Sequence, residues 1–569
     1  MRDRVRHPRT LRAALAAVVI ALLAVTTGCV SIPTSGSVNP GLAEAPDQPV
    51  DLDVFARGPQ PGATQQQILD GFIDAAASPS GNYEIARQFL TDGFADVWEA
   101  DTGVTIDVLA DRSFTPVSAD VIRAQAVPAA SLAPNGQYLE TLAGVPLQLE
   151  YRFEQVDEEW RISSAPSGVL MDETNFQLVY RDYTLAFFDP QFRFVVPDVR
   201  WFAGRDSAQT SIVRALLAGP AEWLAPGVVS AFPEDLTLDP GTVPVSNGVA
   251  EVSLAGAAFD NLRTIQLMQY QLEQSLQSVR NVDDVQLSLN GVVQDSPELT
   301  DRPERSPRVD PRPAVYDGQA FGHLSATGDE VSPIGGISDQ VVALAPTGAA
   351  LGPDGTAAAV RSADGVWLVR EDAERELLDP RAGLIVPALD VDGIVWSVPA
   401  DAPDELAWFA SDGGDGNQIG VPWTASSILT LQVSRDGTRL VALLAEGSRT
   451  RVVAASIQRD EAGLPIALGP VALELAGSGG APIDVAWLDP GTVGTLTQSA
   501  TGEPRLALQE LGAPSDPGEG PANAIQVDGA NSIRDLRVLT SDGDIATRAG
   551  VGWQVQSRDI VFLATQQTG

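Results

Sequence analysis

The sequence predicts a multidomain chain, in which two α+β domains are followed by an all-β propeller. Three observations support this prediction. The chain has 569 residues, too many for one hydrophobic core. Its first half mixes helical periodicity with alternating strand patterns. Its second half consists of short strand patterns separated by Asp-Gly turns, so the two halves belong to different fold classes.

The N-terminal 28 residues have the pattern of an export signal. Five arginines precede an apolar run over residues 13–25, which is shorter than the ~20 residues that a spanning helix needs. Small residues then lead to Cys29, where a lipoprotein signal places the acylated thiol, although Thr26 stands where an aliphatic residue is usual. We expect residues 1–28 to be a lipoprotein signal peptide and Cys29 to carry lipid. A buried structural cysteine and an ordinary signal cleaved nearby are the alternatives.

The charge of the chain bears on what it binds. Its net charge is −39, and removal of the signal, with five Arg and one Asp, leaves about −43. Such a surface repels nucleic acid and anionic lipid headgroups. We therefore expect no nucleic-acid partner. The lipid on Cys29 is expected to hold the chain at the extracytoplasmic face of the cell membrane, because two acyl chains give stable anchoring.

The residue inventory argues against catalysis and metal binding. With Cys29 used for lipid, no disulfide or thiolate metal site can form, and His323 is the one histidine outside the signal. The sequence lacks a Gly-rich phosphate loop, a His-Glu-x-x-His helix and a Gly-x-Ser-x-Gly elbow. It therefore predicts no enzyme, no cofactor and no metal. A glycan-cleaving pair of carboxylates is the weakest alternative, since 75 acidic residues supply pairs by chance.

Residues 29–62 are rich in Pro, Gly and Ser and predict a flexible tether. The first domain, 63–182, opens with an amphipathic helix from Thr64, and strand patterns follow that end in a hairpin between residues 147–153 and 160–162. Helices followed by antiparallel strands predict an α+β domain. Their order resembles the nuclear-transport-factor-2-like fold. Some members of that fold are enzymes with a pocket Asp or His, but no His is available here, which favours a binding or spacer domain.

The second domain, 183–293, shows a strand stopped at Asp189-Pro190 and a helix that Ser207 caps. A hairpin follows at Asn247-Gly248, and a long helix spans 258–279. These elements predict a second α+β domain.

Three aromatic residues of this segment are candidates for partner binding: Trp201, Trp223 and Phe232. Aromatic side chains are favoured at binding surfaces, so the three residues are candidates to line a peptide or glycan site. The alternative is that they pack inside the domain, and the sequence does not separate the two interpretations.

Residues 294–315 predict a linker, because prolines alternate with Arg302, Arg305, Arg308 and Arg312. Repeated proline favours an extended polyproline-like chain. The arginines of a solvated linker would face water. The alternative is that they engage a carboxylate-rich partner.

The last domain, 316–569, predicts a β-propeller of five or six blades. Its turns repeat at Asp354, Asp392, Asp436, Asp489 and Asp542, with spacings of 38, 44, 53 and 53 residues. Four-stranded blades have repeats of about 40–50 residues. A pair of β-sandwiches is the alternative fold. Blades present rigid loops, so a partner-binding platform is the expected use.

Two stretches carry a family resemblance. They are GCVSIPTSGSV at 28–38 and LLAGPAEWLAPGV at 216–228, the latter within a segment similar to the GerMN domain of spore-germination and envelope proteins. Together they resemble the LpqB family of actinobacterial lipoproteins, and the resemblance follows the whole chain in order. It implies a lipid-anchored accessory protein that binds the extracytoplasmic domain of the sensor kinase MtrB and modulates MtrA/MtrB signalling. Through that signalling, the protein would affect the cell envelope and cell division. A scaffold that binds peptidoglycan is the alternative.

Overall fold

The structure is a computed structural model that describes residues 57–141, 144–204, 208–256, 261–447, 449–476, 479–550 and 552–568. The signal peptide, Cys29 and the predicted cap Ser207 lie outside the described residues, which belong to one compact unit. Among the helices described, none combines the length and the apolar character that crossing a bilayer requires.

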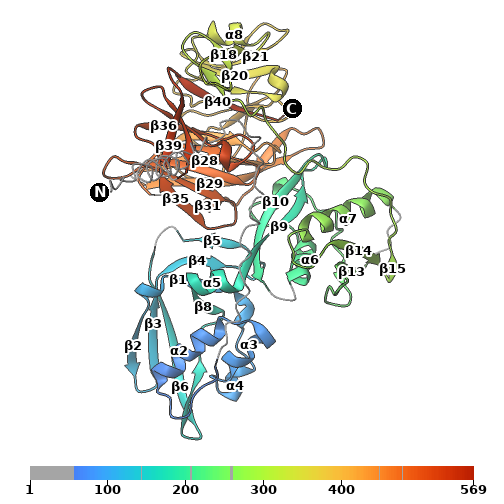
Figure 1. The fold of residues 1–569 in the computed structure, drawn as a ribbon, viewed down its shortest axis with the longest axis vertical. Coiled ribbons are helices and arrows are strands. Elements are labelled where there is room, and N and C mark those ends of the chain that lie inside the picture. Colours follow the sequence, from blue (N-terminus) through green and yellow to red (C-terminus); the bar gives the residue numbers. More distant parts are fainter. Residues whose placement is uncertain are drawn as a thin grey trace, which may run out of the picture. The chain divides into compact units, whose positions relative to one another are not determined.

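The N-terminal domain packs helices against two four-stranded sheets (Figure 1). Its sheet orders are β5-β4-β1-β8, with β1 and β8 parallel, and β2-β3-β6-β7. The helices are α2 (Gln65–Ala76), α3 (Ser80–Arg87), α4 (Asp92–Ala95) and α5 (Glu173–Val179). The strands are β1 (Val104–Asp107), β2 (Ser113–Ser118), β3 (Val121–Ala126), β4 (Pro128–Leu132), β5 (Tyr138–Glu140), β6 (Leu147–Val156), β7 (Glu159–Ser164) and β8 (Val169–Asp172).

The sequence predicted the first helix and the hairpin of this domain, and both are confirmed. Thr64 accepts a hydrogen bond from the N–H of Gln67, whose side chain bonds back to Thr64, so a capping box starts α2. The hairpin joins β6 to β7, and Asp157 and Glu158 adopt positive φ at its turn. Strands β2, β4 and β8 and helix α5 were not predicted, because their short patterns lack clear periodicity.

The middle domain begins with a long antiparallel hairpin and continues as a mixed sheet, β11-β13-β14-β15. Helix α7 connects the parallel strands β13 and β14, as a crossover must. Its elements are β9 (Tyr180–Phe188), β10 (Val195–Ala203), α6 (Ala208–Ala218), the 3₁₀ turn η3 (Ala225–Gly227), β11 (Thr237–Leu238), β12 (Val245–Ser246), β13 (Val249–Ala255), α7 (Leu262–Leu276), β14 (Asp284–Leu289) and β15 (Val292–Val293).

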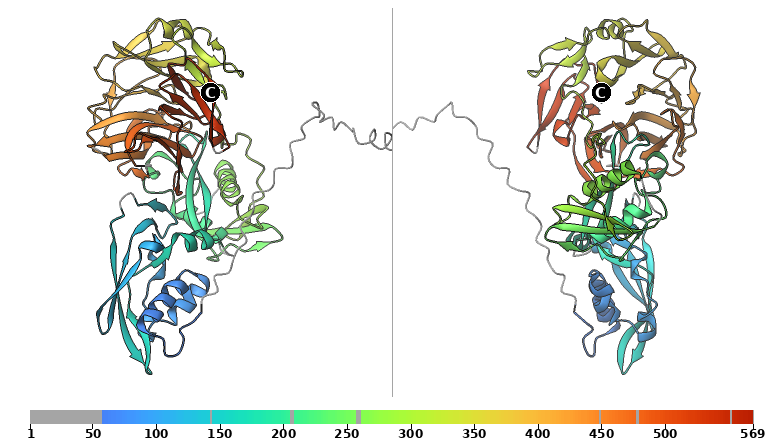
Figure 2. Two further views of the ribbon diagram at one scale, coloured as in Figure 1. Left: turned by 60° about the vertical axis from the view of Figure 1, so that its left-hand side comes forward. Right: turned by 90° about the vertical axis from the view of Figure 1, so that its right-hand side faces the viewer.

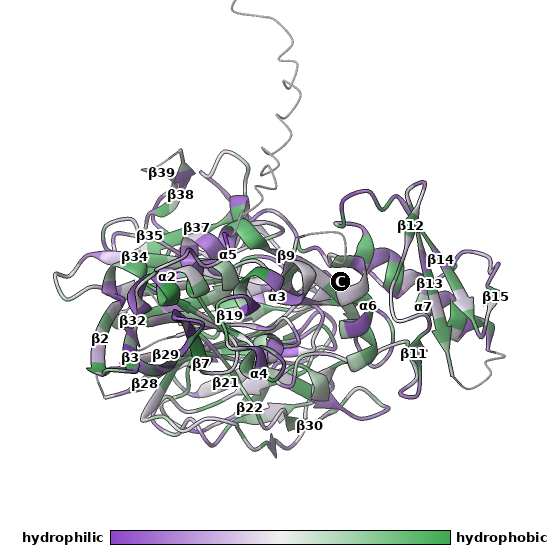
Figure 3. Cartoon of the chain, turned by 90° about the horizontal axis from the view of Figure 1, so that it is seen from below, coloured by the Kyte–Doolittle hydropathy of each residue, from purple (hydrophilic) through white to green (hydrophobic). Residues whose placement is uncertain are grey.

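Local sequence patterns account for much of this domain. Asn247 and Gly248 have φ of 54° and 83°, and they join β12 to β13 in the predicted hairpin. Helix α7 is shorter than the predicted 258–279, since the side chain of Asn261 caps it. Buried positions alternate with half-buried or exposed ones along β13 and β14. Figure 3 shows the hydropathy of the residues in these two strands.

Among the described residues, the C-terminal part, residues 314–568, contains one eight-stranded sheet, one five-stranded sheet and three four-stranded sheets. The eight-stranded sheet divides at its parallel pair, β40 and β19, into two antiparallel halves of four strands, so we count six antiparallel sheets and call this part the six-sheet region. Two of the sheets join through the parallel pair β40 and β19. The first is β40 (Phe562–Gln566), β16 (Ala314–Tyr316), β17 (Phe321–Leu324) and β18 (Val331–Pro333); helix α8 (Ser338–Val342) follows. The second is β19 (Gly348–Leu351), β20 (Ala357–Ser362), β21 (Gly365–Arg370) and β22 (Glu376–Asp379).

The remaining four sheets follow in chain order. The third sheet is β23 (Ala388–Leu389), β24 (Val395–Ser397), β25 (Ala407–Phe409) and β26 (Asn417–Gln418), and the fourth is β27 (Ser427–Val433), β28 (Arg439–Glu446), β29 (Arg449–Arg459) and β30 (Pro465–Leu468), with β31 (Leu473–Leu475) beside β29. The fifth is β32 (Ala481–Trp487), β33 (Thr492–Gln498), β34 (Pro504–Glu510) and β35 (Ser515–Glu519). The sixth is β36 (Ala524–Asp528), β37 (Arg537–Thr540), β38 (Ile545–Ala549) and β39 (Gly552–Ser557).

The first strands of the six sheets contact one another in a cyclic order. β19 contacts β23, β23 contacts β27, β27 contacts β32, β32 contacts β36, β36 contacts β40, and β40 contacts β19. Figure 2 shows the sheets of this region, coloured from yellow to red, in two further views. Strand β40 also pairs with β16, so the last strand of the chain completes the first sheet.

Residues 294–313, which we call the strap, run along the folded domains. The N–H of Val309 donates to the side-chain oxygen of Asn531 (2.9 Å), and Asn531 donates back to the Val309 carbonyl (3.0 Å). Pro303 and Pro307 are buried. Two of its arginines form ion pairs with acids of the strap itself: Arg302 with Glu298 and Arg312 with Asp310. The predicted solvated linker is therefore a docked segment over much of its length.

The middle domain and the six-sheet region share one hydrophobic core. Phe187, Trp223 and Leu224 belong to the same buried cluster as Val441 and Trp487. A salt bridge between Arg193 and Asp392 (2.7 Å) lies beside this core. The two parts consequently contact each other through apolar packing and through charge.

Candidate functional site

Trp201 lies where the three domains meet. Its indole N–H donates to the carbonyl of Gly512 in the six-sheet region (2.9 Å), and its ring packs 5.8 Å from Tyr138 and 5.1 Å from Phe176 of the N-terminal domain. Nearby, Glu140 accepts hydrogen bonds from the N–H and hydroxyl of Ser515 (3.0 and 2.7 Å). Trp201 thus helps to hold the domains together.

Trp223 and Phe232 are buried in the middle domain, at 5% and 7% exposure. The structure brings both into one core, whereas Trp201 belongs to the neighbouring aromatic cluster. These positions favour the packing interpretation, and partner binding by the three residues stays a prediction. Cys29 lies outside the described residues, so its lipidation also stays a prediction.

The segment LLAGPAEWLAPGV is one of the parts of the middle domain that contact the six-sheet region. A Cβ atom at Gly227 would lie 2.9 Å from the carbonyl oxygen of Thr438 and 3.0 Å from that of Ile457. Only glycine permits this approach of two backbones. The stretch that carries the family resemblance is therefore an interface between domains.

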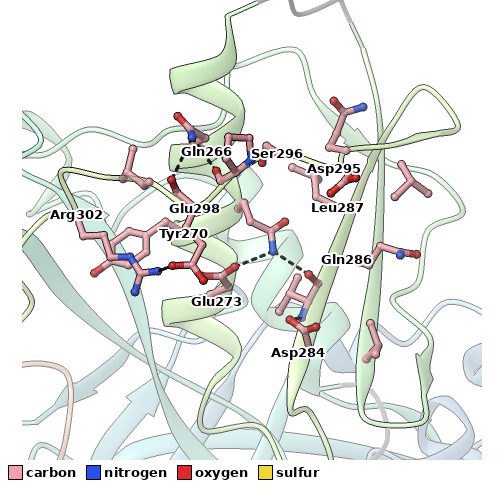
Figure 4. Close-up of a pocket in the computed structure, with 17 residues that line it drawn as sticks. Gln266, Tyr270, Glu273, Asp284, Gln286, Leu287, Asp295, Ser296, Glu298 and Arg302 are labelled. Carbon is pink, nitrogen blue, oxygen red and sulfur yellow. Dashed lines mark hydrogen bonds and ion pairs between the residues drawn. The ribbon is translucent and has the colours of Figure 1, made fainter.

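A polar pocket on the middle domain is the candidate ligand site (Figure 4). Its volume is about 550 Å³, and it lies between α7, strands β14 and β15, and the start of the strap. Four carboxylates and one guanidinium line it, together with glutamine side chains. The charged residues are Glu273, Asp284, Asp295, Glu298 and Arg302.

Hydrogen bonds hold the pocket's side chains in place. Gln266 donates to the carbonyl of Pro297 (2.7 Å), which ties the strap to α7. Gln269 donates to Glu273 (2.9 Å) and to the Val285 carbonyl (2.8 Å). Sequence reasoning missed this site, although Gln266, Gln269 and Glu273 recur at the three- and four-residue spacing of one helix face.

The electrostatics of the pocket suit neutral or cationic polar groups. Burial raises the pKa of Tyr270, although Arg302 and Arg305 lower it, so the phenol stays protonated at neutral pH. Its hydroxyl donates to the Pro303 carbonyl (3.0 Å). Amide and carboxylate oxygens accept hydrogen bonds from hydroxyl and amide groups, which sugars and peptides carry. Among the described residues, no group of three or more His, Cys, Asp or Glu is arranged to hold a metal.

Three family models match the chain in order. Residues 58–177 match the lipoprotein LpqB N-terminal domain, residues 183–295 match a sporulation and spore germination domain, and residues 322–561 match the lipoprotein LpqB beta-propeller domain. None of these descriptions names a catalytic activity.

The curated relatives reported below are all named lipoprotein LpqB. The chain is 26% identical to lipoprotein LpqB of Thermobifida fusca, over 87% of this chain and 89% of the relative. It is 26% identical to lipoprotein LpqB of Mycolicibacterium smegmatis, over 92% and 90%. A shorter match, at 32% identity over 38% and 36%, is to lipoprotein LpqB of Rhodococcus jostii.

Solved structures are similar to part of the chain at low identity. Hydrazine synthase of Kuenenia stuttgartiensis is 11% identical, with a TM-score of 0.28, over 37% of this chain and 66% of that one. A chain of the nidogen/laminin complex is 10% identical, with a TM-score of 0.28, over 38% and 82%. Such low scores carry no conclusion about fold or activity.

Proposed function

This chain belongs to the LpqB family of lipoproteins, and on that premise we propose that it is a lipid-anchored accessory protein of a sensor kinase. It binds the extracytoplasmic domain of the kinase MtrB, and it thereby modulates MtrA/MtrB signalling, the cell envelope and division. Binding to one state of the sensor shifts the population of that state, which is how a partner without catalytic groups changes a kinase's output.

The observation that carries this proposal is the match of all three domains, in order, to full-length relatives of the family. The docked strap and the shared core support it, since a rigid platform loses little conformational entropy when it binds. The partner itself follows from the family resemblance.

Two fold assignments, of the six-sheet region and of the N-terminal domain, go beyond the family membership. We propose that the six sheets are the blades of a closed propeller, and the cyclic contacts of their first strands support this. The nuclear-transport-factor-2-like assignment of the N-terminal domain stays a prediction.

Pull-down of purified residues 30–569 with the sensor domain of MtrB tests the function. We expect retention of the sensor domain in salt at physiological strength. No retention, with binding of the same protein to isolated peptidoglycan instead, would contradict the proposal and favour the alternative.

That alternative is a scaffold that binds peptidoglycan, and the polar pocket beside α7 is the specific observation that favours it. Gln266, Gln269 and Glu273 present hydrogen-bonding groups to a volume of about 550 Å³. Pockets of several hundred Å³ are the usual size for small ligands. Peptidoglycan binding by the Glu273→Gln variant, compared with binding by wild type, tests whether this pocket binds the polymer.

Replacing Cys29 with alanine is predicted to release the protein from membranes. Two acyl chains give stable anchoring, and the net charge of about −43 after signal removal disfavours contact with anionic lipid. Fractionation and fatty-acid labelling should show a soluble, unlabelled variant. A variant that remains in the membrane fraction would identify residues 13–25 as an uncleaved anchor.

A further inference from the structure

The six-sheet region contains a cavity that the proposed function does not use. Its volume is about 330 Å³, and residues from the first strands of all six sheets, or directly beside them, line it. Its wall includes Gly348, Val386, Leu429, Ile483, Ile525 and Leu563. The cavity therefore lies at the centre around which the sheets contact one another.

Part of the cavity's lining lies where first strands begin. Gly348, Ile483 and Ile525 lie at or near the starts of β19, β32 and β36. The contacts with the middle domain and strap involve residues beyond the ends of first strands, such as Asp392 and Asn531. Asp392 and Asn531, which make those contacts, therefore do not line the cavity.

Arg361 places a positive charge in this cavity. Its Nε donates to the Thr347 hydroxyl (2.9 Å), and its two terminal nitrogens donate to the carbonyls of Leu384 (3.4 Å) and Thr347 (3.2 Å). All three acceptors are neutral, and burial lowers the pKa of Arg361. A guanidinium carries five N–H donors, so donors remain for a ligand.

Asp484 is the second charged residue that lines the cavity. Its carboxylate accepts from the Thr430 hydroxyl (2.7 Å) and from the N–H of Val527 (3.0 Å). Burial raises its pKa to about 6, although these two donors lower it, and Asp528 behind it raises it further. Asp528 in turn faces Arg435 and Arg537.

Aliphatic side chains surround these charges. Ile525 is 45% exposed, and Val386, Leu429 and Ile483 are half-buried in the cavity wall. Such a wall favours an apolar group beside the charged one.

We propose that this cavity binds a carboxylate attached to an aliphatic group, as at the end of a peptide chain or in a free branched acid. Arg361 binds the carboxylate through its remaining N–H donors, and the aliphatic wall holds the neighbouring group. Charge-assisted hydrogen bonds of this kind contribute more than neutral ones. Asp484, when ionised, opposes the ligand's charge and weakens binding.

Titration calorimetry of the full-length protein in detergent tests the proposal with N-acetylleucine and, as uncharged control, N-acetylleucinamide. We expect N-acetylleucine to bind and the amide to bind at least roughly tenfold more weakly. Arg361→Gln should weaken the binding of N-acetylleucine by roughly tenfold. Arg505→Gln, at an exposed position on β34 outside the cavity, should leave this binding unchanged.

Asp484→Asn should have the opposite effect and tighten binding. The amide can keep both hydrogen bonds of Asp484, because its oxygen accepts from Val527 and its NH₂ donates to the Thr430 hydroxyl. A merely structural role of either residue would not give effects of opposite sign. For wild type, binding should tighten as the pH falls through about 6, where Asp484 takes up a proton.

The probe 4-methylpentanoate, which lacks the peptide amide, distinguishes a peptide end from a free acid as the ligand of the cavity. Tighter binding of N-acetylleucine identifies a peptide end, and the reverse order identifies a free acid; both support the carboxylate site. Failure of wild type to bind either acid, or equal binding by wild type and Arg361→Gln, would overturn it. These outcomes do not depend on whether the kinase binds.

Discussion

Replacing Asp436 with alanine is expected to lower the free energy of unfolding by about 3–5 kcal/mol. The side chain of Asp436 is 1% exposed, and it forms an ion pair with Arg439, which is fully buried. It also accepts hydrogen bonds from the Ser434 hydroxyl (2.7 Å) and from the N–H of Thr438 (2.9 Å). Alanine would leave the guanidinium buried without its carboxylate, and that accounts for the size of the loss.

The pH dependence of this pair has a definite sign. Burial by itself would raise the pKa of Asp436, but Arg439 and the surrounding donors hold it below its usual value. Because folding lowers this pKa, the ionised pair contributes stability above the pKa of the unfolded chain, about 3.9, and loses it as the pH falls through the folded pKa.

Urea denaturation near neutral pH, followed by circular dichroism, measures the loss. Asp542→Ala is the control, since Asp542 also stands in an Asp-Gly turn, between β37 and β38, but is exposed, and its side chain bonds only to the Asn523 amide among the described residues. Its effect should stay within about 0.5 kcal/mol. Equal losses for the two variants would contradict a special role of the buried pair.

Gly227→Val is expected to lower the free energy of unfolding by about 1–3 kcal/mol, the usual effect of overpacking. A Cβ at this position would approach the carbonyl oxygens of Thr438 and Ile457 to 2.9 and 3.0 Å. Backbone atoms cannot rotate away as a flexible side chain can. The middle domain should therefore separate from the six-sheet region before either part unfolds.

Hydrogen exchange near Ile457 measures this separation, because its N–H donates to the Thr438 carbonyl at the contact (2.7 Å). Gly420→Val serves as control, since a Cβ there meets no atom within 4 Å. We expect faster exchange in Gly227→Val and wild-type exchange in Gly420→Val. Wild-type exchange in both would mean that the loop does not hold the domains together.

Local patterns predicted the elements whose causes are local. The helix after Thr64 follows from one apolar face and one capping residue, and the hairpin at Asn247-Gly248 follows from two residues that tolerate positive φ. The repeated Asp-Gly turns likewise indicated several similar sheets. In each case the determining contacts lie within a few residues of one another.

Local sequence patterns could not predict the contacts between residues far apart in the chain. The proline-rich composition of residues 294–313 is the same whether they are solvated or docked, and the bonds between Val309 and Asn531 join positions 222 residues apart. Trp201, Trp223 and Phe232 show why burial cannot be read from residue type alone. The cavity with Arg361 and Asp484 depends on six sheets at once, and neither residue stands in a recognisable motif.

The pairing of β40 with β16 has a consequence for biosynthesis. Phe562 and Leu563 pair with Tyr316 and Val315, so the first sheet stays incomplete until the last residues are available. If the chain is exported from its N-terminus, as the signal pattern of residues 1–28 predicts, the two α+β domains can fold while the remainder is still crossing the membrane. The edges of β16 and β19 that pair with β40 stay open until the C-terminal residues arrive. A protein truncated shortly before β40 would keep that edge exposed, and it should be a substrate for envelope proteases and prone to aggregate.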